Sequence, residues 1–371
     1  MKSRAMKSVL AACALVFSGL AGTAQALDEV RIGAILPMTG GAASYGQWMR
    51  QGMDIATDEI NAEWGGSPKL TVIYEDSRTN PKDAVQAMNK LVSVDKAQVI
   101  MTTLTGVTKA LAPIATQNQV VLTTSATLPG LTEESEYLFR NSTNLGSEIS
   151  RLVEFASKRY GTAAVLAVNL EWAQWGRDAF VRGFEEAGGK VVADQSFPPE
   201  ATDVRAQLTR IKAASPEVLL VLAYKTTGVA LKQARELGIE AQFIGTLDFE
   251  LPEVIEIAQE AANGSVYTKA AFDPESPGSE VTQAYVAEYQ RRNGELPEVY
   301  SATMYDMLHM LSDAVNACEA ETDCIREKLL SIENYPGASG VTTFLPNGDV
   351  DKPVDLKAIE DGKYVDYRAE G

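Results

Sequence analysis

The sequence predicts an α/β protein built from two doubly wound lobes, each a parallel sheet covered by helices. Apolar runs of strand length alternate with segments of helical periodicity, which is the pattern of repeated βαβ units. The run at 218–222 is apolar at every position and indicates a strand buried on both faces, as in a parallel sheet. One sheet of ten or more such strands would be unusually large. The turn-rich segment 140–146 lies midway along the pattern, so we predict two lobes.

The first half of the pattern opens with a strand at 30–36, which a turn rich in proline and glycine ends. A long helix is expected at 46–63. A second helix is expected to begin at Pro81, because Asn80 suits an N-cap and Pro81 suits the first helical position. The remaining elements expected here are strands at 70–74, 99–103 and 120–124 and helices at 81–92 and 107–117.

The second half repeats the same alternation after Arg140. Helices are expected at 147–159, 176–187, 204–213 and 227–237, and strands at 163–168, 191–197, 218–222 and 243–245. Helices of this length supply right-handed crossovers between parallel strands. A later helix at 301–317 carries His309, the only histidine, which we place at the surface or at the edge of the core.

The N-terminus has the features of an export signal. The first seven residues carry three basic side chains, and the apolar run at 9–20 is too short to remain in a bilayer. An Ala-x-Ala site ends at Ala26, so residues 1–26 are predicted to be a signal peptide that is removed on export to the periplasm. A lipoprotein box ending at Cys13 is the alternative, but few apolar residues precede that cysteine.

Two cysteines, Cys318 and Cys324, remain beyond the signal and stand six positions apart in a polar sequence. In an oxidising compartment such a pair indicates a local disulfide, which would staple the turn between two helices. A zinc site is disfavoured because the chain has a single histidine.

Charge and motifs narrow the function classes. The net charge of −17 argues against nucleic acid or an anionic membrane surface as a partner. The sequence has no Gly-x-Ser-x-Gly elbow, no phosphate-binding lysine loop and no metal-spaced histidine cluster. We therefore predict no enzyme and no cofactor, with a hydrolase as the alternative. An exported α/β protein without a catalytic constellation is most simply a binding protein.

Ligands of doubly wound sheets bind beyond the carboxyl ends of the strands. In the first lobe these ends lead into small hydroxyl side chains and helix N-termini, which suit a carboxylate. In the second lobe they lead into aromatic side chains, which suit an apolar ligand body. The loops concerned are 40–46, 102–106 and 123–127 in the first lobe and 169–175, 224–226 and 246–248 in the second.

Four segments carry a family resemblance. They are Ile32-Gly33-Ala34-Ile35-Leu36-Pro37-Met38-Thr39-Gly40 with Tyr45-Gly46, the turn at 76–81, the stretch 123–132, and Thr202-Asp203-Val204 leading to Ile211-Lys212. In this order and spacing they resemble the periplasmic binding proteins of branched-chain amino acid ABC transporters, the type I Leu/Ile/Val-binding family. The resemblance covers essentially all of the mature chain.

This resemblance implies two lobes joined by three hinge strands, which close on a ligand. The first lobe would comprise residues 28–143 and 274–348, and the second 144–273 and 349–371. The expected ligand is a branched-chain or other hydrophobic amino acid. The expected partners are the membrane permease and ATPase subunits of an ABC importer, with the protein itself a monomer. A sensory receptor that reports to a membrane partner is the alternative role.

The resemblance also assigns binding roles. Thr105 would bind the ligand carboxylate, the backbone carbonyl of Ser125 would receive the ligand ammonium, and Thr127 would touch both. The aromatic residues implied around the ligand side chain are Tyr45, Trp175, Tyr224 and Tyr300, with Trp172 as a weaker candidate.

One position departs from the family pattern. Where its amino-acid binders have a glutamate for the ammonium, this sequence has Leu247 followed by Asp248. We expect a one-residue shift to bring Asp248 into that role, because a buried ammonium needs a carboxylate. With Asp248 pointing away, the alternative ligands are a 2-oxo acid, an aromatic carboxylate or a short amide.

Two smaller expectations follow. Ser77 and Leu104 occupy the places of a disulfide that is common in the first lobe of this family, so that bridge is absent here. Glu171 and Lys225 are expected at the rim of the cleft, where either could pair across it on closure.

Overall fold

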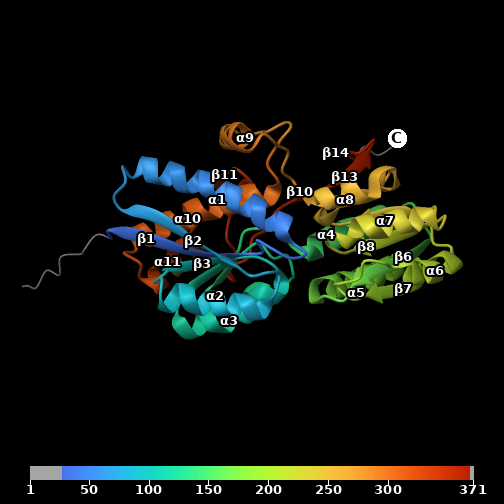
Figure 1. The fold of residues 1–371 in the computed structure, drawn as a ribbon, viewed down its shortest axis with the longest axis horizontal. Helices are drawn as coiled ribbons and strands as arrows, with labels where there is room; N and C mark the ends of the chain where they lie inside the picture. Colours follow the sequence, from blue (N-terminus) through green and yellow to red (C-terminus); the bar gives the residue numbers. More distant parts are fainter. Residues whose placement is uncertain (1–26, 368–371) are drawn as a thin grey trace, which may run out of the picture.

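The structure is a computed structural model, and it describes residues 27–367. The expected signal peptide, with Cys13 and the cleavage site at Ala26, lies outside the described residues. Figure 1 shows two lobes side by side along the long axis of the molecule. The orange helices α10 and α11 lie with the blue N-terminal elements in the first lobe, whereas the green and yellow elements form the second.

The first lobe is built on five parallel strands in the order β2-β1-β3-β4-β5. The strands are β1 Glu29–Leu36, β2 Lys69–Asp76, β3 Val99–Thr102, β4 Val121–Thr124 and β5 Leu138–Arg140. The helices are α1 Ala43–Glu63, α2 Pro81–Ser93, α3 Thr105–Asn118, α9 Glu280–Asn293, α10 Val299–Ala317 and α11 Thr322–Leu330, with a 3-10 helix η1 Leu131–Glu134. Sequence analysis found β1 to β4 and missed β5.

The second lobe is built on seven strands in the order β14-β13-β10-β9-β8-β6-β7. The strands are β6 Thr162–Val168, β7 Lys190–Phe197, β8 Val218–Leu222, β9 Gln242–Gly245, β10 Val266–Ala270, β13 Val354–Glu360 and β14 Lys363–Asp366. The helices are α4 Leu145–Ser157, α5 Glu171–Glu186, α6 Arg205–Ala214, α7 Thr226–Glu236 and α8 Pro252–Ala258, with 3-10 helices η2 Leu247–Glu250 and η3 Gln259–Ala262. The sheet is mixed rather than purely parallel, because β13 and β14 return antiparallel at its edge.

Within the described residues the chain passes three times between the lobes: after β5, after β10, and after the small hairpin β11 Tyr335–Gly337 and β12 Gly340–Thr342. The strands β3, β4 and β8 are buried at every position, as parallel strands covered on both faces should be. None of the helices in residues 27–367 combines the length and the apolar character that crossing a membrane would need.

A close backbone contact joins α10 to α1 in the first lobe. A Cβ atom placed on Gly52 of α1 would lie 2.1 Å from the carbonyl oxygen of Ser301 in α10. Only glycine fits there, because any side chain would overlap that backbone. The packing of α1 therefore depends on a helix that follows it by more than two hundred residues in the chain.

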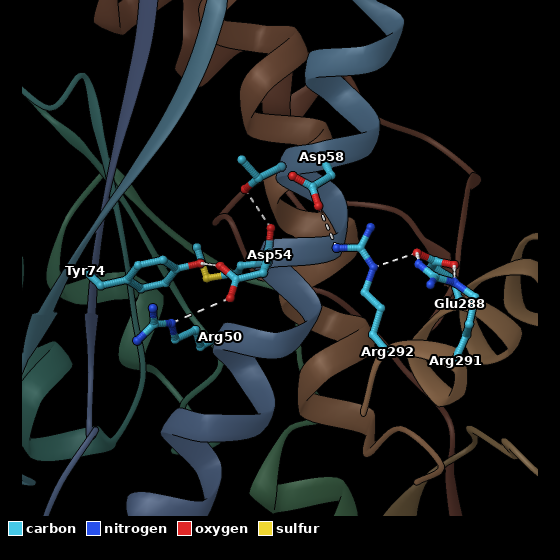
Figure 2. Close-up of polar contacts among 9 residues, drawn as sticks. Arg50, Asp54, Asp58, Tyr74, Glu288, Arg291 and Arg292 are labelled. Carbon is cyan, nitrogen blue, oxygen red and sulfur yellow. Dashed lines mark hydrogen bonds and ion pairs between the residues drawn. The ribbon is translucent and has the colours of Figure 1, made fainter. Parts of the chain in front are cut away.

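Polar side chains on the outside of the first lobe reinforce this arrangement, as Figure 2 shows. Arg292 of α9 pairs with Asp58 of α1 at 2.6 Å and with Glu288 of its own helix at 2.6 Å. On the same helix α1, Asp54 accepts a hydrogen bond of 2.7 Å from the hydroxyl of Tyr74 in β2. Both contacts are at the surface, so they orient the helices more than they stabilise them.

The predicted disulfide is confirmed. Cys318, at the end of α10, is bonded to Cys324 in the first turn of α11, and their Cα atoms are 5.6 Å apart. It closes the polar turn between these two helices.

Candidate ligand-binding site

A cavity lies between the two lobes, where the carboxyl ends of β3, β4, β8 and β9 face it. The space free of atoms in and around it is about 490 Å³, part of which is open solvent. Its lining residues are Tyr45, Thr103, Leu104, Thr105, Ser125, Ala126, Thr127, Leu145, Glu148, Trp172, Tyr224, Thr246, Leu247, Asp248 and Tyr300. The structure thus brings together the predicted binding residues except Trp175, and no lysine, arginine or histidine of the described chain lines the cavity.

The first lobe contributes hydroxyl groups and a helix N-terminus. Thr105 is the first residue of α3, whose first turn has no side-chain cap. Leu104 before it has φ of 68°, a conformation that is costly for a branched residue. Ser125 donates a hydrogen bond of 2.9 Å to Thr103. The uncapped helix amides and these hydroxyls form an end of the cavity that is suited to an anion.

A buried arginine fixes the loop that carries Ser125 and Thr127. Arg140 is fully buried, and its Nη1 donates to the carbonyl of Leu128 at 2.7 Å. Its Nε donates to Asp349 at 2.7 Å, in a second segment that crosses between the lobes. A guanidinium is always charged, so this carboxylate compensates it, and the pair holds the loop in one position.

Asp248 points into the cavity from the second lobe. It lies in η2, just after β9, and only 7% of its surface is exposed. Its Oδ1 accepts a hydrogen bond of 2.6 Å from Tyr45, and its Oδ2 accepts one of 2.8 Å from Thr246. Burial raises the pKa of Asp248 to about 6. The adjacent Leu247 also lines the cavity.

A second carboxylate, Glu148, lines the cavity and was missed by sequence analysis. It lies in the first turn of α4 and is 4% exposed. Thr143 donates to its Oε1 at 2.8 Å and Thr268 to its Oε2 at 3.3 Å. Burial, with a contribution from the charge of Asp248, raises the pKa of Glu148 to about 7. A signal was present, because position 148 is three residues after Leu145 and so shares the apolar face of its helix.

Aromatic rings form the walls. The ring centroids of Tyr45 and Tyr300 are 5.0 Å apart, and those of Trp172 and Tyr224 are 5.2 Å apart. Trp175 does not line the cavity, contrary to the expectation from the resemblance. The helix α5 begins at Glu171, five residues before the expected start, so Trp172 faces the cavity and Trp175 packs half-buried against the core beside Gly146.

Three polar contacts join the lobes around the cavity. One is the hydrogen bond between Tyr45 and Asp248 described above. Ser44 at the start of α1 donates to Glu253 of α8 at 3.0 Å. Lys109 of α3 pairs with Glu171 of α5 at 2.7 Å, so Glu171 does form an ion pair across the cleft. Lys225, the other rim charge, is exposed. The two lobes are therefore in a closed arrangement.

Comparisons with known proteins agree with this architecture. Residues 29–363 match the family described as periplasmic binding protein. The chain is 26% identical to a Leu/Ile/Val-binding protein homolog 3 of Brucella melitensis, over 94% of this chain and 95% of that protein.

Two solved structures are also similar. The leucine-binding protein LivK of Thermotoga maritima is 26% identical, with a TM-score of 0.86 over 91% of this chain and 98% of that chain. The substrate-binding protein LivJ of Streptococcus pneumoniae, solved with isoleucine, is 25% identical, with a TM-score of 0.83 over 91% and 97%. With the match spanning nearly all described residues, the chain belongs to the periplasmic binding protein family.

Proposed function

We propose that this protein is the extracytoplasmic solute-binding component of an ABC importer, and that it binds an amino acid of branched-chain size in the cavity between its lobes. The observation that carries the proposal is the polarity of that cavity. Hydroxyl groups and the N-terminus of α3 lie on the first lobe, and the buried carboxylate of Asp248 lies on the second. An amino acid carries the matching charges, a carboxylate and an ammonium.

The main-chain groups of the ligand then have defined partners. Thr105 and Thr127, with the first amides of α3, receive the carboxylate. Asp248 receives the ammonium, and the carbonyl of Ser125 completes its coordination. Hydrogen bonds to charged groups contribute about 1.5–3 kcal/mol each, so these contacts favour an amino acid over a ligand that lacks the matching groups.

The aromatic walls favour a compact, largely apolar ligand body. Tyr45, Tyr224, Tyr300 and Trp172 surround the space that is left for the ligand side chain. The relatives named as leucine-, isoleucine- and valine-binding proteins support a ligand of this size. A 2-oxo acid or an aromatic carboxylate fits the charge less well, because it would add a third negative group beside Asp248 and Glu148 with no cation to balance it.

Closure couples binding to shape. The ligand binds first to the hydroxyl groups of the first lobe, and the second lobe then swings over it about the three crossing segments. Contacts made only in the closed form, such as Lys109 with Glu171, favour closure. We assign residues 28–143 with 274–348 to the first lobe and residues 144–273 with 349–371 to the second. The permease recognises the surfaces that the two lobes present together in the closed form. The protein acts as a monomer in the periplasm, after cleavage behind Ala26, and has no catalytic role.

The test is calorimetry on residues 27–371 with leucine, isoleucine, valine and phenylalanine, each beside its 2-oxo acid. We expect binding of amino acids and not of their 2-oxo acids. The double variant Thr105→Ala with Thr127→Ala should lose affinity by a few kcal/mol, at about 1.5–3 kcal/mol for each lost bond. Thr209→Ala, on the exposed face of α6, is the matched control. Preference for acids without an amine, or unchanged affinity in the double variant, contradicts the proposal.

A further inference from the structure

The carboxylate of Glu148 has no partner in the binding scheme above. One carboxylate, Asp248, is enough for the single ammonium of an amino acid. Glu148 nevertheless lines the same cavity and is 96% removed from solvent, as its 4% exposure shows. An ionisable group is expensive to bury, so its presence in a ligand cavity calls for a partner.

The two acids are held in the same manner. Each oxygen of Asp248 accepts one hydroxyl hydrogen bond, from Tyr45 and from Thr246. Each oxygen of Glu148 likewise accepts one, from Thr143 and from Thr268. These hydroxyls orient the carboxylates without neutralising them, and each oxygen keeps a further lone pair for another donor.

The protein itself supplies no counter-charge for Glu148. The strand β10 carries Thr268, one of the hydroxyl donors to Glu148, and the next residue in this strand is the basic Lys269. Successive side chains of a strand point to opposite faces, and Lys269 pairs with Glu250 at 2.8 Å on the other side. Since no basic side chain of the described chain lines the cavity, a counter-charge for Glu148, or a donor beyond these two hydroxyls, must come from the ligand.

The position of Glu148 shows which part of the ligand it meets. Glu148, Tyr45 and Tyr300 line the same cavity. The ligand carboxylate is already assigned to Thr105 and Thr127, and the ammonium to Asp248, so the ligand side chain is the part left for Glu148. Tyr300 forms the aromatic wall with Tyr45, around the ligand side chain rather than its carboxylate. Glu148 therefore faces the side chain of the ligand.

We propose that Glu148 is a specificity-determining residue, and that the ligand is a short amino acid whose side chain ends in a hydrogen-bond donor, an amine, an amide or a hydroxyl, rather than in hydrocarbon alone. This inference rests on the proposed function and refines its ligand class. An aliphatic side chain would leave the carboxyl of Glu148 buried with no donor beyond the hydroxyls of Thr143 and Thr268. A donor at the end of the ligand side chain would hydrogen-bond to the carboxylate of Glu148 and so give this buried group a partner.

The test is a ranking of ligands by calorimetry at about pH 8. Size-matched pairs set threonine against valine, asparagine and 2,4-diaminobutyrate against leucine, and ornithine against norleucine. We expect the donor-bearing member to bind about 10- to 100-fold more tightly, since a hydrogen bond to a charged group is worth about 1.5–3 kcal/mol. The diamino acids distinguish a cationic donor from a neutral one, because a cation gains an ion pair with Glu148 in addition to the hydrogen bond.

Glu148→Gln should reduce this ratio to a few-fold while the affinity for aliphatic amino acids stays equal or rises. Glu154→Gln is the matched control, on the same helix but exposed and paired with Lys158. Should Glu148→Gln fail to fold, the wild-type ranking alone decides. Tighter binding of the aliphatic members, or a ratio unchanged in Glu148→Gln, overturns the role of Glu148 and leaves the proposed function standing. Failure of every amino acid to bind overturns both.

Discussion

Replacing Glu148 by glutamine should stabilise the unliganded protein, and more so as the pH rises. Burial raises the pKa of this carboxyl from 4.5 to about 7. As the pH increases from 4.5 to 7, the unfolded chain releases its proton while the folded protein retains it, so the wild type loses stability over this interval. A tenfold change in an ionisation constant is worth about 1.4 kcal/mol, so the accumulated loss is about 3 kcal/mol above pH 7.

Glutamine has nearly the same shape, carries no charge and escapes this loss. Urea unfolding of wild type and Glu148→Gln at about pH 4 and about pH 8 measures the effect. The gain in unfolding free energy of the variant should be small at about pH 4 and approach 3 kcal/mol at about pH 8.

The control is Glu154→Gln on the same helix. The hydrogen bond from Lys158, with that from Arg151, lowers the pKa of Glu154, so removing its charge should bring no gain that grows with pH. An advantage of Glu148→Gln that is independent of pH would refute the reasoning, because it would mean that the carboxyl is not desolvated in the cavity.

Three further outcomes are expected. Arg140→Met should cost about 3–5 kcal/mol in unfolding free energy and weaken ligand binding, because it leaves the buried carboxylate of Asp349 unpaired and frees the loop that carries Ser125 and Thr127. Adding Asp349→Leu to this variant should restore part of the stability. Gly52→Ala should cost about 1–3 kcal/mol by overlap with the carbonyl of Ser301, whereas Gly106→Ala, whose nearest neighbour is at 3.5 Å, should be tolerated in thermal unfolding. Removing the Cys318–Cys324 disulfide by Cys324→Ser should cost less than the ~3 kcal/mol of a 15-residue loop and leave calorimetric affinity unchanged.

Sequence analysis predicted most of the fold because buried parallel strands leave a strong pattern. The run at Val218–Leu222 is apolar throughout, and it became a central strand. The three-residue strand Leu138–Arg140 was missed because it is too short to show a period. The start of α5 was placed late because Leu170 occupies its N-cap, a residue with no capping side chain to mark the boundary.

The candidate site was predicted in part, for a related reason. Loops at the carboxyl ends of strands converge wherever the sheet is parallel, so Thr105 and Asp248 could be placed together from order alone. Glu148 was missed although it shares the apolar face of α4 with Leu145, because a glutamate in the first turn of a helix is ordinarily a solvated residue that suits the helix dipole. One of its hydrogen-bond partners, Thr268, is more than a hundred residues away in the chain, and such contacts are invisible in one sequence.

The contact between Gly52 and Ser301 also bears on when the first lobe can finish folding. The helix α1, whose buried side includes Met49, Met53 and Ile60, packs more extensively against α10 than against any other element. The first lobe therefore cannot complete its packing until α10, which follows most of the second lobe in the chain, has been made and has folded.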